Sequence, residues 1–339
     1  MNFLERAWYK KAGWLILLWP IAFIFQGLTK LRRIFQQENS PPTKHNVPVV
    51  VIGNISVGGT GKTPLLIAIA QQLQAAGLRP GIISRGFGGE GADYPMQVNG
   101  NDNPAIAGDE PVLIARKTNC PVVIDPDRRS ALDYLLDSNK VDVVLSDDGL
   151  QHYKLFRNIE VIVVDGQRQF GNGMCFPAGP LREPIKRLQE ADFIVVNVTG
   201  LIGAPMVSSS ASMTMEPKGL VNMVTGEKRP FDGAPFNMGN KVQAVSGIGN
   251  PKRFYNLLDK LPYRIIPLEF PDHHQFVESD FQSGIFDEHQ PIVMTEKDAI
   301  KCEKFAKSNF WYLQTQVKLQ GSFLEEFTNK IKTFTNKNN

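Results

Sequence analysis

A glycine-rich segment near the start of this 339-residue chain carries the residues with the clearest chemistry. Residues 47–63 read VPVVVIGNISVGGTGKT, a β-branched apolar run followed by a turn that ends in Gly-Lys-Thr. The glycines allow successive backbone N–H groups to point at phosphate oxygens, while the Lys62 ammonium can bridge the outer phosphates and the Thr63 hydroxyl can ligate Mg²⁺. The segment therefore predicts a site for a nucleoside triphosphate such as ATP, formed by Ser56, Val57, Gly58, Gly59, Thr60, Gly61, Lys62 and Thr63.

The surroundings of this loop fit a strand–loop–helix unit. An apolar-periodic segment at 65–73 predicts a helix whose N-terminal dipole favours the same anion. The strict G-x-x-x-x-G-K-[ST] pattern asks for glycine at position 56, where this chain has Ser56. The alternative is a glycine-rich turn that binds nothing. It is disfavoured because the strand, the Gly-Lys-Thr triplet and the helix all occur in order.

Two carboxylates follow another strand-like run. Residues 141–145 lead into Asp147 and Asp148, and ligands of open parallel sheets bind outside the carboxyl ends of the strands. In P-loop proteins an acid at the end of a neighbouring strand holds Mg²⁺, so a metal site is predicted here, with a solvated turn as the alternative. Gln151 and His152 come next and are expected to face the same cleft, although a single histidine is more often structural.

Further acids and arginines occur at predicted turns. Asp109 and Glu110 directly precede an apolar helical stretch, where they either cap the helix or serve metal binding or proton acceptance from an attacking hydroxyl. Arg128 follows an Asp-Pro-Asp turn, and Arg182 lies in a proline-rich loop. An arginine so placed is a candidate clamp for a transferring phosphate, with an ordinary surface arginine as the alternative.

A second group of ionisable residues lies far downstream. Residues 270–276 read FPDHHQF, in which Asp272, His273 and His274 could bind a metal or form an acid–base unit. A metal is disfavoured because no third spaced His or Cys accompanies them, and neighbouring residues of a strand point to opposite faces, so one site normally uses one histidine. The Glu-Lys-Asp triplet at 296–298 also follows a strand-like run, which predicts a second contribution to the cleft.

The N-terminal segment 12–25 is apolar throughout and contains Trp14, Trp19 and Pro20. Its length falls short of the roughly 20 residues that a helix needs to cross a bilayer, and no small-residue cleavage site of a signal peptide follows it. Residues 1–50 hold seven basic and two acidic residues, although the whole chain has a net charge of only +3. We therefore expect a membrane-associated helix at an anionic cytoplasmic surface, with an ordinary buried helix as the alternative.

Composition and charge narrow the possible functions and the compartment of the protein. The small net charge gives no case for nucleic-acid binding. The three cysteines are widely spaced, which argues for a reducing compartment and against a disulfide scaffold or a zinc site. We expect the body of the protein to lie in the cytosol.

Apolar runs alternate with helical stretches along most of the chain. This pattern predicts an α/β fold with a P-loop NTPase-type, mostly parallel sheet and helices on both faces. The serine-rich and Gly/Pro-rich stretches after about residue 200 are typical of a linker or hairpin, and a smaller C-terminal α/β domain follows. The predicted units are an N-terminal membrane-associated helix at 1–30, a P-loop core at 31–205, a linker or hairpin at 206–240 and the C-terminal domain at 241–339.

Several motifs, in order, resemble those of the tetraacyldisaccharide 4'-kinase family, the lipid A 4'-kinases of Gram-negative bacteria. They are GNISVGGTGKTP at 53–64, SRGFGG at 84–89, GDEPVL at 108–113, SDDGLQHY at 146–153, GPLREP at 179–184, FPDHHQF at 270–276 and MTEKDAIK at 294–301. The resemblance covers nearly the whole chain and includes the serine in place of the first glycine of the loop and the apolar N-terminus, which in relatives engages the inner membrane.

The resemblance implies transfer of the ATP γ-phosphoryl group to the 4'-hydroxyl of a tetraacylated glucosamine disaccharide 1-phosphate, forming the lipid A precursor lipid IVA of lipopolysaccharide at the cytoplasmic face of the inner membrane. It implies that Asp109 and His273 form a dyad that activates the acceptor hydroxyl. Phosphate charge would be stabilised by Lys62, Arg128 and Arg182, and Mg²⁺ would be served by Thr63, Asp147 and Glu110. Weaker substrate-binding expectations fall on Asp148, Gln151 and His152.

A rival from another class is a membrane-associated P-loop ATPase switch of the partitioning or carrier type. Such proteins typically carry a lysine just before the Gly-Gly pair, where this chain has Val57, and they leave the Asp272-His273 pair unexplained. The sequence leaves open which of His273 and His274 acts, and how Glu110, Asp147 and Asp148 share a metal. It also leaves open whether residues 12–25 cross the membrane.

Overall fold

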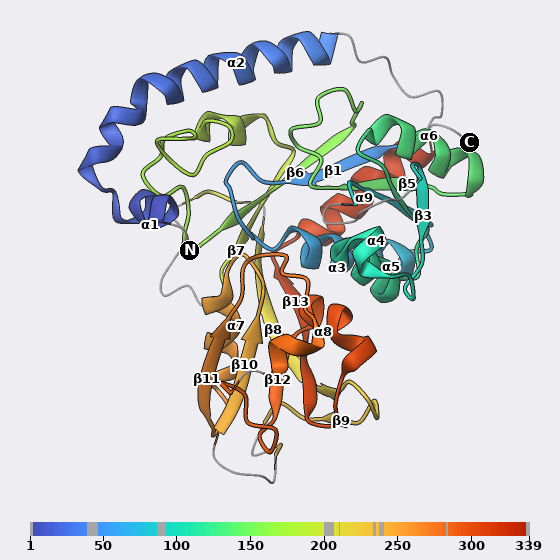
Figure 1. The fold of residues 1–339 in the computed structure, drawn as a ribbon. Coiled ribbons are helices and arrows are strands. Elements are labelled where there is room, and N and C mark those ends of the chain that lie inside the picture. The colour runs from blue at the N-terminus through green and yellow to red at the C-terminus, as the bar shows by residue number, and fades with distance from the viewer. Residues whose placement is uncertain are drawn as a thin grey trace.

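The computed structural model describes residues 3–38, 47–86, 93–199, 207–209, 211–232, 235–236, 241–282 and 284–336 (Figure 1). Part of the SRGFGG motif, at 87–89, and parts of the predicted linker at 206–240 lie outside these residues. The described strands form one 13-stranded sheet in the order β11-β10-β12-β13-β8-β7-β6-β1-β5-β2-β4-β3, with β9 paired to β8.

Six neighbouring parallel strands form the part of the sheet that carries the glycine-rich loop. They are β7 (Phe193–Asn197), β6 (Ile159–Asp165), β1 (Val49–Gly53), β5 (Val143–Asp147), β2 (Pro80–Ser84) and β4 (Val122–Ile124). The short strand β3 (Met96–Val98) joins the outer edge in antiparallel orientation. The mostly parallel sheet predicted from the apolar runs is confirmed.

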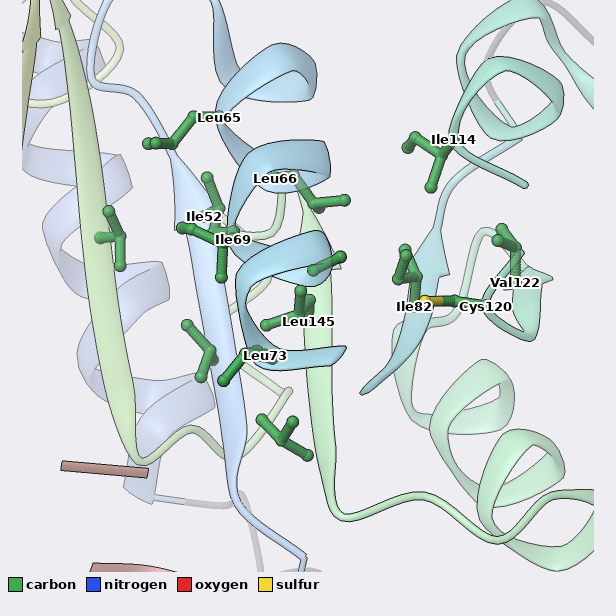
Figure 2. Packing of buried hydrophobic residues seen from close by; sticks show 14 of the residues in the cluster. Ile52, Leu65, Leu66, Ile69, Leu73, Ile82, Ile114, Cys120, Val122 and Leu145 are labelled. Atoms are coloured by element: carbon green, nitrogen blue, oxygen red, sulfur yellow. The ribbon is translucent and has the colours of Figure 1, made fainter. Parts of the chain in front are cut away.

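Both faces of this part of the sheet are buried. In β1, Val50 and Ile52 belong to one apolar core, while Val49 and Val51 belong to another on the opposite face. The first core is covered by α3 (Lys62–Ala75) and α5 (Asp109–Thr118), and the second by α6 (Arg128–Ser138). Figure 2 shows the α3 side chains packed along β1 and β5. A continuous apolar strand is expected where helices cover both faces, so the site is built on a rigid support.

The part of the sheet from β7 to β3, with the helices that cover it, forms the first lobe. The second lobe contains the remaining strands and lies below the first in Figure 1. Its parallel strands are β10 (Lys241–Ser246), β11 (Arg264–Glu269), β12 (Ile292–Thr295) and β13 (Phe310–Gln320). The helices α7 (Pro251–Leu258) and α8 (Glu296–Cys302) belong to the same lobe. The described residues also form the 3₁₀ turns η1 (Gly13–Leu18), η2 (Ile185–Glu190), η3 (Glu278–Phe281) and η4 (Glu303–Phe305). In the first lobe, a short helix α4 (Pro104–Ala107) precedes α5.

Two elements connect the lobes across the predicted domain boundaries. Strand β8 (Ala211–Asn222) starts parallel to β7 and continues antiparallel to β13, and it also pairs with the short strand β9 (Lys228–Arg229). Helix α9 (Phe323–Asn336) lies at the end of the chain, yet Phe323 and Phe327 pack against Phe193 in the core of the first lobe. The sheet therefore runs through both lobes without a break.

The N-terminal helices lie against the first lobe on the loop that contains Arg182. The Trp8 indole, on α1 (Phe3–Lys10), donates to the Pro177 carbonyl at 2.9 Å, and Phe25, on α2 (Trp19–Glu38), packs edge-on against Phe176. Within the described residues, the stretch Gly13–Gln36 is long and apolar enough to cross a membrane. An 18-residue window within it has a mean hydropathy of 1.6 and is 11% buried.

Candidate active site

The glycine-rich loop connects β1 to α3 as predicted. Its positive φ angles occur at Gly58 (102°) and Gly61 (101°), whereas Ser56 is not among the positive-φ residues. A positive φ favours glycine, and because Ser56 does not have one, the serine in place of the first motif glycine costs the loop no backbone strain. A side chain at Gly61 would also meet Asn197, whose amide donates to the Thr60 carbonyl at 2.9 Å.

The Lys62 ammonium is held by two oxygen atoms at the base of the loop. Its Nζ lies 3.3 Å from Oδ1 of Asn54 and 3.4 Å from Oδ1 of Asp148. The second Asp148 oxygen lies 3.5 Å from Nη1 of Arg182. Burial alone would raise the pKa of Asp148, but the charges of Lys62 and Arg182 lower it. Asp148 therefore stays charged and holds both cations at the loop.

A series of hydrogen bonds through Gln151 fixes the side chain of Arg182. Its Nη1 lies 3.3 Å from Oε1 of Gln151, and the Gln151 amide donates to Glu183 at 2.8 Å and to the Asn54 carbonyl at 3.1 Å. The Arg182 backbone N–H donates to the Ile55 carbonyl at 2.7 Å. Gln151, predicted to face the cleft, thus touches the same arginine that the loop positions.

Asp147 ends strand β5 beside the loop and is nearly inaccessible to solvent, with 2% of its surface exposed. Its Oδ1 accepts no hydrogen bond from the residues that the structure describes. Burial raises the pKa of Asp147 to about 7, and the charges of Glu110 and Asp148 add to the rise. An unpartnered carboxylate oxygen among other acids is the environment that a divalent cation stabilises.

Oxygen donors of this kind fit Mg²⁺. Within the described part of the chain, no group of three His, Cys, Asp or Glu side chains is arranged to hold a metal by itself. Mg²⁺ is usually bound by one or two carboxylates together with substrate phosphates, so a complete protein cage is not required. Glu110, also predicted as a ligand, is paired here with Lys297 at 2.8 Å.

Arg128 and His152 lie near enough for the Arg128 charge to act on the imidazole. Arg128 is buried and donates to the Asp125 carbonyl at 2.9 Å and to the Asp147 carbonyl at 3.4 Å, so it braces the ends of β4 and β5. Burial lowers the pKa of Arg128 to about 10. Burial and the charges of Arg128 and Arg85 lower the pKa of His152 to about 4, which keeps this imidazole neutral.

Asp109 and His273 meet although 163 residues separate them in the chain. Asp109 is the first residue of α5 and is buried, and its Oδ2 lies 3.3 Å from Nδ1 of His273. Burial alone would raise the pKa of Asp109, but the hydrogen bond from His273 and the charge of Lys297 lower it to about 2. The same hydrogen bond raises the pKa of His273. A charged carboxylate therefore orients the imidazole.

His274 has a different environment. Its Nε2 lies 2.9 Å from Asp280, and its ring packs against Phe270 and Phe276. His273 adopts a positive φ of 60°, and its backbone N–H donates to the Gly247 carbonyl at 3.1 Å. This turn directs the two histidines to separate partners, and only His273 is seen beside Asp109.

The second lobe reaches the glycine-rich loop through residues near Gly249. A Cβ at Gly249 would lie 3.1 Å from the Gly59 nitrogen and 2.9 Å from the Asp272 carboxylate. An ion pair of 2.7 Å between Arg253 and Asp165 joins the lobes in the interior. The structure thus brings the Asp109–His273 pair and the glycine-rich loop together where the two lobes meet.

The sequence analysis did not single out several residues that support the site. Asn54 precedes the loop and was treated only as part of it, yet it touches Lys62. Asp165 ends β6 as Asp147 ends β5, so the position at a strand's carboxyl end was the available signal. Arg253 carried no motif of its own, and its contact with Asp165 arises only from tertiary packing.

A parallel strand, a glycine-rich loop with a positioned lysine, and a neighbouring acid at a strand end define a P-loop nucleotide-binding protein. The acid–imidazole pair beside the loop adds a group that can accept a proton. Within the large P-loop class, this combination corresponds to a phosphotransferase rather than to a switch.

Comparisons with known proteins identify the family. The family model Tetraacyldisaccharide-1-P 4'-kinase matches residues 14–332. The Tetraacyldisaccharide 4'-kinase of Legionella pneumophila (strain Lens) is 43% identical over 96% of both chains, and that of Nitrosococcus oceani is 45% identical over 94% of this chain and 91% of the relative. The chain therefore belongs to the tetraacyldisaccharide 4'-kinase family, as its motifs predicted.

A solved structure supports the fold. The "apo" form of LpxK from Aquifex aeolicus in complex with ATP is 27% identical, with a TM-score of 0.76, and the match covers 95% of this chain and 99% of that one. The family and this structure confirm the predicted kinase class and ATP as the nucleotide. The roles of single residues stay predictions.

Proposed function

We propose that this protein transfers the γ-phosphoryl group of ATP to the 4'-hydroxyl of a tetraacylated glucosamine disaccharide 1-phosphate, producing the lipid A precursor of lipopolysaccharide. Support comes from the family and from one observation above all. The Asp109–His273 pair, at 3.3 Å, lies near the contact between Gly249 of the second lobe and the glycine-rich loop, because Asp272 adjoins both Gly249 and His273. An ATPase switch has no need of such a pair.

The proton of the acceptor hydroxyl passes to Nε2 of His273, while Asp109 keeps the proton on Nδ1 and thereby fixes the tautomer. The freed oxygen forms a bond to the γ-phosphorus as the bond to the β–γ bridging oxygen breaks, and ADP leaves. In the structure, Lys297 lies 3.4 Å from Nε2. The acceptor hydroxyl takes the place of the Lys297 ammonium, which moves aside and releases its partner Glu110.

The remaining residues position phosphates and neutralise charge. Lys62 and Arg182, both held by Asp148, face the transferring group, and Arg128 secures the strand end that carries Asp147. Thr63 and Asp147 would hold Mg²⁺, and Glu110 would become available to it once Lys297 moves aside. When bound, Mg²⁺ supplies charge neutralisation on the β- and γ-phosphate oxygens. Gln151 and His152 contribute neutral polar contacts for the acceptor.

The test is transfer of label from γ-labelled ATP to tetraacylated disaccharide 1-phosphate in detergent micelles. We expect label in the lipid and little ATP consumption without it. The matched control is the same lipid already phosphorylated at the 4'-hydroxyl, which accepts no label. ADP release that is equal with and without acceptor, together with unlabelled lipid, would establish the ATPase switch instead.

The N-terminal helices supply the membrane contact of this proposal. An apolar stripe with helical spacing, defined as Leu17, Ile21, Ile24, Leu28, Leu31 and Phe35, is exposed on η1 and α2, with each side chain at least 54% exposed. Such a stripe, flanked by basic residues, lies in the plane of a bilayer interface. We place the protein at the cytoplasmic face of the inner membrane, with the stripe in the lipid.

Substitution in the stripe tests this placement. The double variant Ile24→Asp/Leu28→Asp is expected to reduce binding to vesicles that contain anionic lipid by at least about 10-fold, because each aspartate in an apolar environment costs up to about 3 kcal/mol. The control is Val224→Asp/Ile285→Asp in the second lobe, whose side chains are 57% and 63% exposed. Equal loss in both variants, or no loss in either, would contradict the placement. Flotation of vesicles with bound protein provides the measurement.

A further inference from the structure

Behind the Asp109–His273 pair lies a set of buried charges for which the chemistry so far has no use. On α8, the Lys301 side chain is 1% exposed and forms a 2.8 Å ion pair with Asp298, which is completely buried. Its Nζ also lies 3.7 Å from Oδ2 of Asp109 and 5.2 Å from the centre of the Phe276 ring. One ammonium thus has two carboxylates and an aromatic face as its surroundings.

Asp298 connects this lysine to the other member of the pair. Its Oδ2 accepts from the Gly247 backbone N–H at 3.0 Å and from the Thr295 hydroxyl at 2.7 Å. The carbonyl of the same Gly247 accepts from the backbone N–H of His273 at 3.1 Å. A single carboxylate therefore supports Asp109 through Lys301 and His273 through Gly247.

Burial of these charges is poorly explained by stability. Removing ions from water costs several kcal/mol each, and a buried ion pair is often no more stabilising than apolar residues of similar volume. Lys297, by contrast, lies at the cleft with 16% of its side chain exposed and contacts Glu110 and His273. Lys297 has the position of a group that gives way to substrate, while Lys301 has the position of a fixed support.

We propose that Lys301 is a positioning residue, held by Asp298, that fixes the Asp109 carboxylate against Nδ1 of His273 when the two lobes are closed. The inference rests on the proposed role of the Asp109–His273 pair. Because Lys301 comes from the second lobe and Asp109 from the first, the contact forms only when α8 lies on α5. The second lobe therefore supplies both the imidazole and the cation that aligns its carboxylate.

The test combines Lys301→Met, which keeps volume and removes charge, with Asp109→Asn. We expect Lys301→Met to lower kcat about 10- to 100-fold with the KM for ATP within about twofold, because a misplacement of about 1 Å costs on the order of 10²-fold. In the Asp109→Asn background, the same change should lower kcat by less than about twofold. A general structural defect would lower kcat equally in both backgrounds.

Lys117→Met is the matched control, since Lys117 pairs with Glu296 across the same α5–α8 interface. It should leave kcat within about twofold. If Lys301→Met does not fold, Asp298→Asn, which keeps shape, should show the same dependence on Asp109. Wild-type kcat in Lys301→Met, or equal losses in both backgrounds, would overturn the inference alone. Wild-type kcat in Asp109→Asn would overturn the proposed dyad and the inference with it.

Discussion

Lys62→Met is expected to lower kcat for lipid phosphorylation by at least about 10³-fold. The ammonium is held by Asn54 and Asp148 at the base of the loop, where it meets the charge that develops on the transferring phosphoryl group. Removing one such preorganised donor costs about 10²–10³-fold, and a charged clamp on a phosphoryl group is worth about 10³–10⁵-fold. Initial rates at saturating ATP and acceptor measure the effect.

The control for Lys62→Met is Lys140→Met, which removes an exposed lysine just after α6. It should leave both kcat and the KM for ATP within about twofold. A loss of less than about 10-fold in Lys62→Met would contradict the placement of the phosphates at this loop, because no other lysine contacts Asn54 and Asp148 in the described part of the chain.

His273→Ala is expected to lower kcat by about 10²–10⁴-fold, the usual contribution of a positioned general base. Because Asp109 raises the pKa of His273, the wild-type rate should increase with pH through a value above the usual value of about 6.5. The variant should lose that part of the pH–rate profile. The contribution of the Asp109–His273 ion pair to folding stability has the opposite pH dependence. It is complete below about pH 6.5 and is lost as the pH rises through the raised pKa of His273.

His274→Ala is the informative comparison for the second prediction. His274 pairs with Asp280 and packs between Phe270 and Phe276, so its loss should lower the free energy of unfolding by about 1–3 kcal/mol. Its kcat, measured below the unfolding temperature, should stay within about threefold of wild type. If His274→Ala showed the larger loss of kcat, the assignment of His273 as the base would be wrong.

The sequence was most informative where the residues that form a site are adjacent in the chain. The loop at 56–63 is a local structure, because glycines, lysine and threonine act on one ligand from adjacent positions. The strand that leads to Asp147 could likewise be predicted, since an apolar run with an acid at its end places that acid at the edge of a parallel sheet. Both predictions needed no contact between distant parts of the chain.

Contacts between distant segments were beyond such reasoning. The residues alone left Asp109 as a cap or an acid and left His273 and His274 equivalent, and only the family resemblance paired Asp109 with His273. The support from Lys301 depends on how α8 packs against α5, which local sequence does not specify. The sequence analysis also placed residues 211–222 in the predicted linker or hairpin, because a serine-rich and a Gly/Pro-rich stretch flank them, whereas they form strand β8, which includes Pro217 and Gly219. The register shift of β13 opposite these residues accommodates them.

The position of α9 has a consequence for how the protein is made. Because Phe323 and Phe327 pack around Phe193, the core of the first lobe is complete only after residues 323–327 have been synthesised, long after its strands. Until then, strand β8 lacks its partner β13 and presents an open edge, the kind of surface on which nascent chains aggregate. A chain truncated before residue 323 is therefore expected to leave apolar surface of the first lobe uncovered and to aggregate.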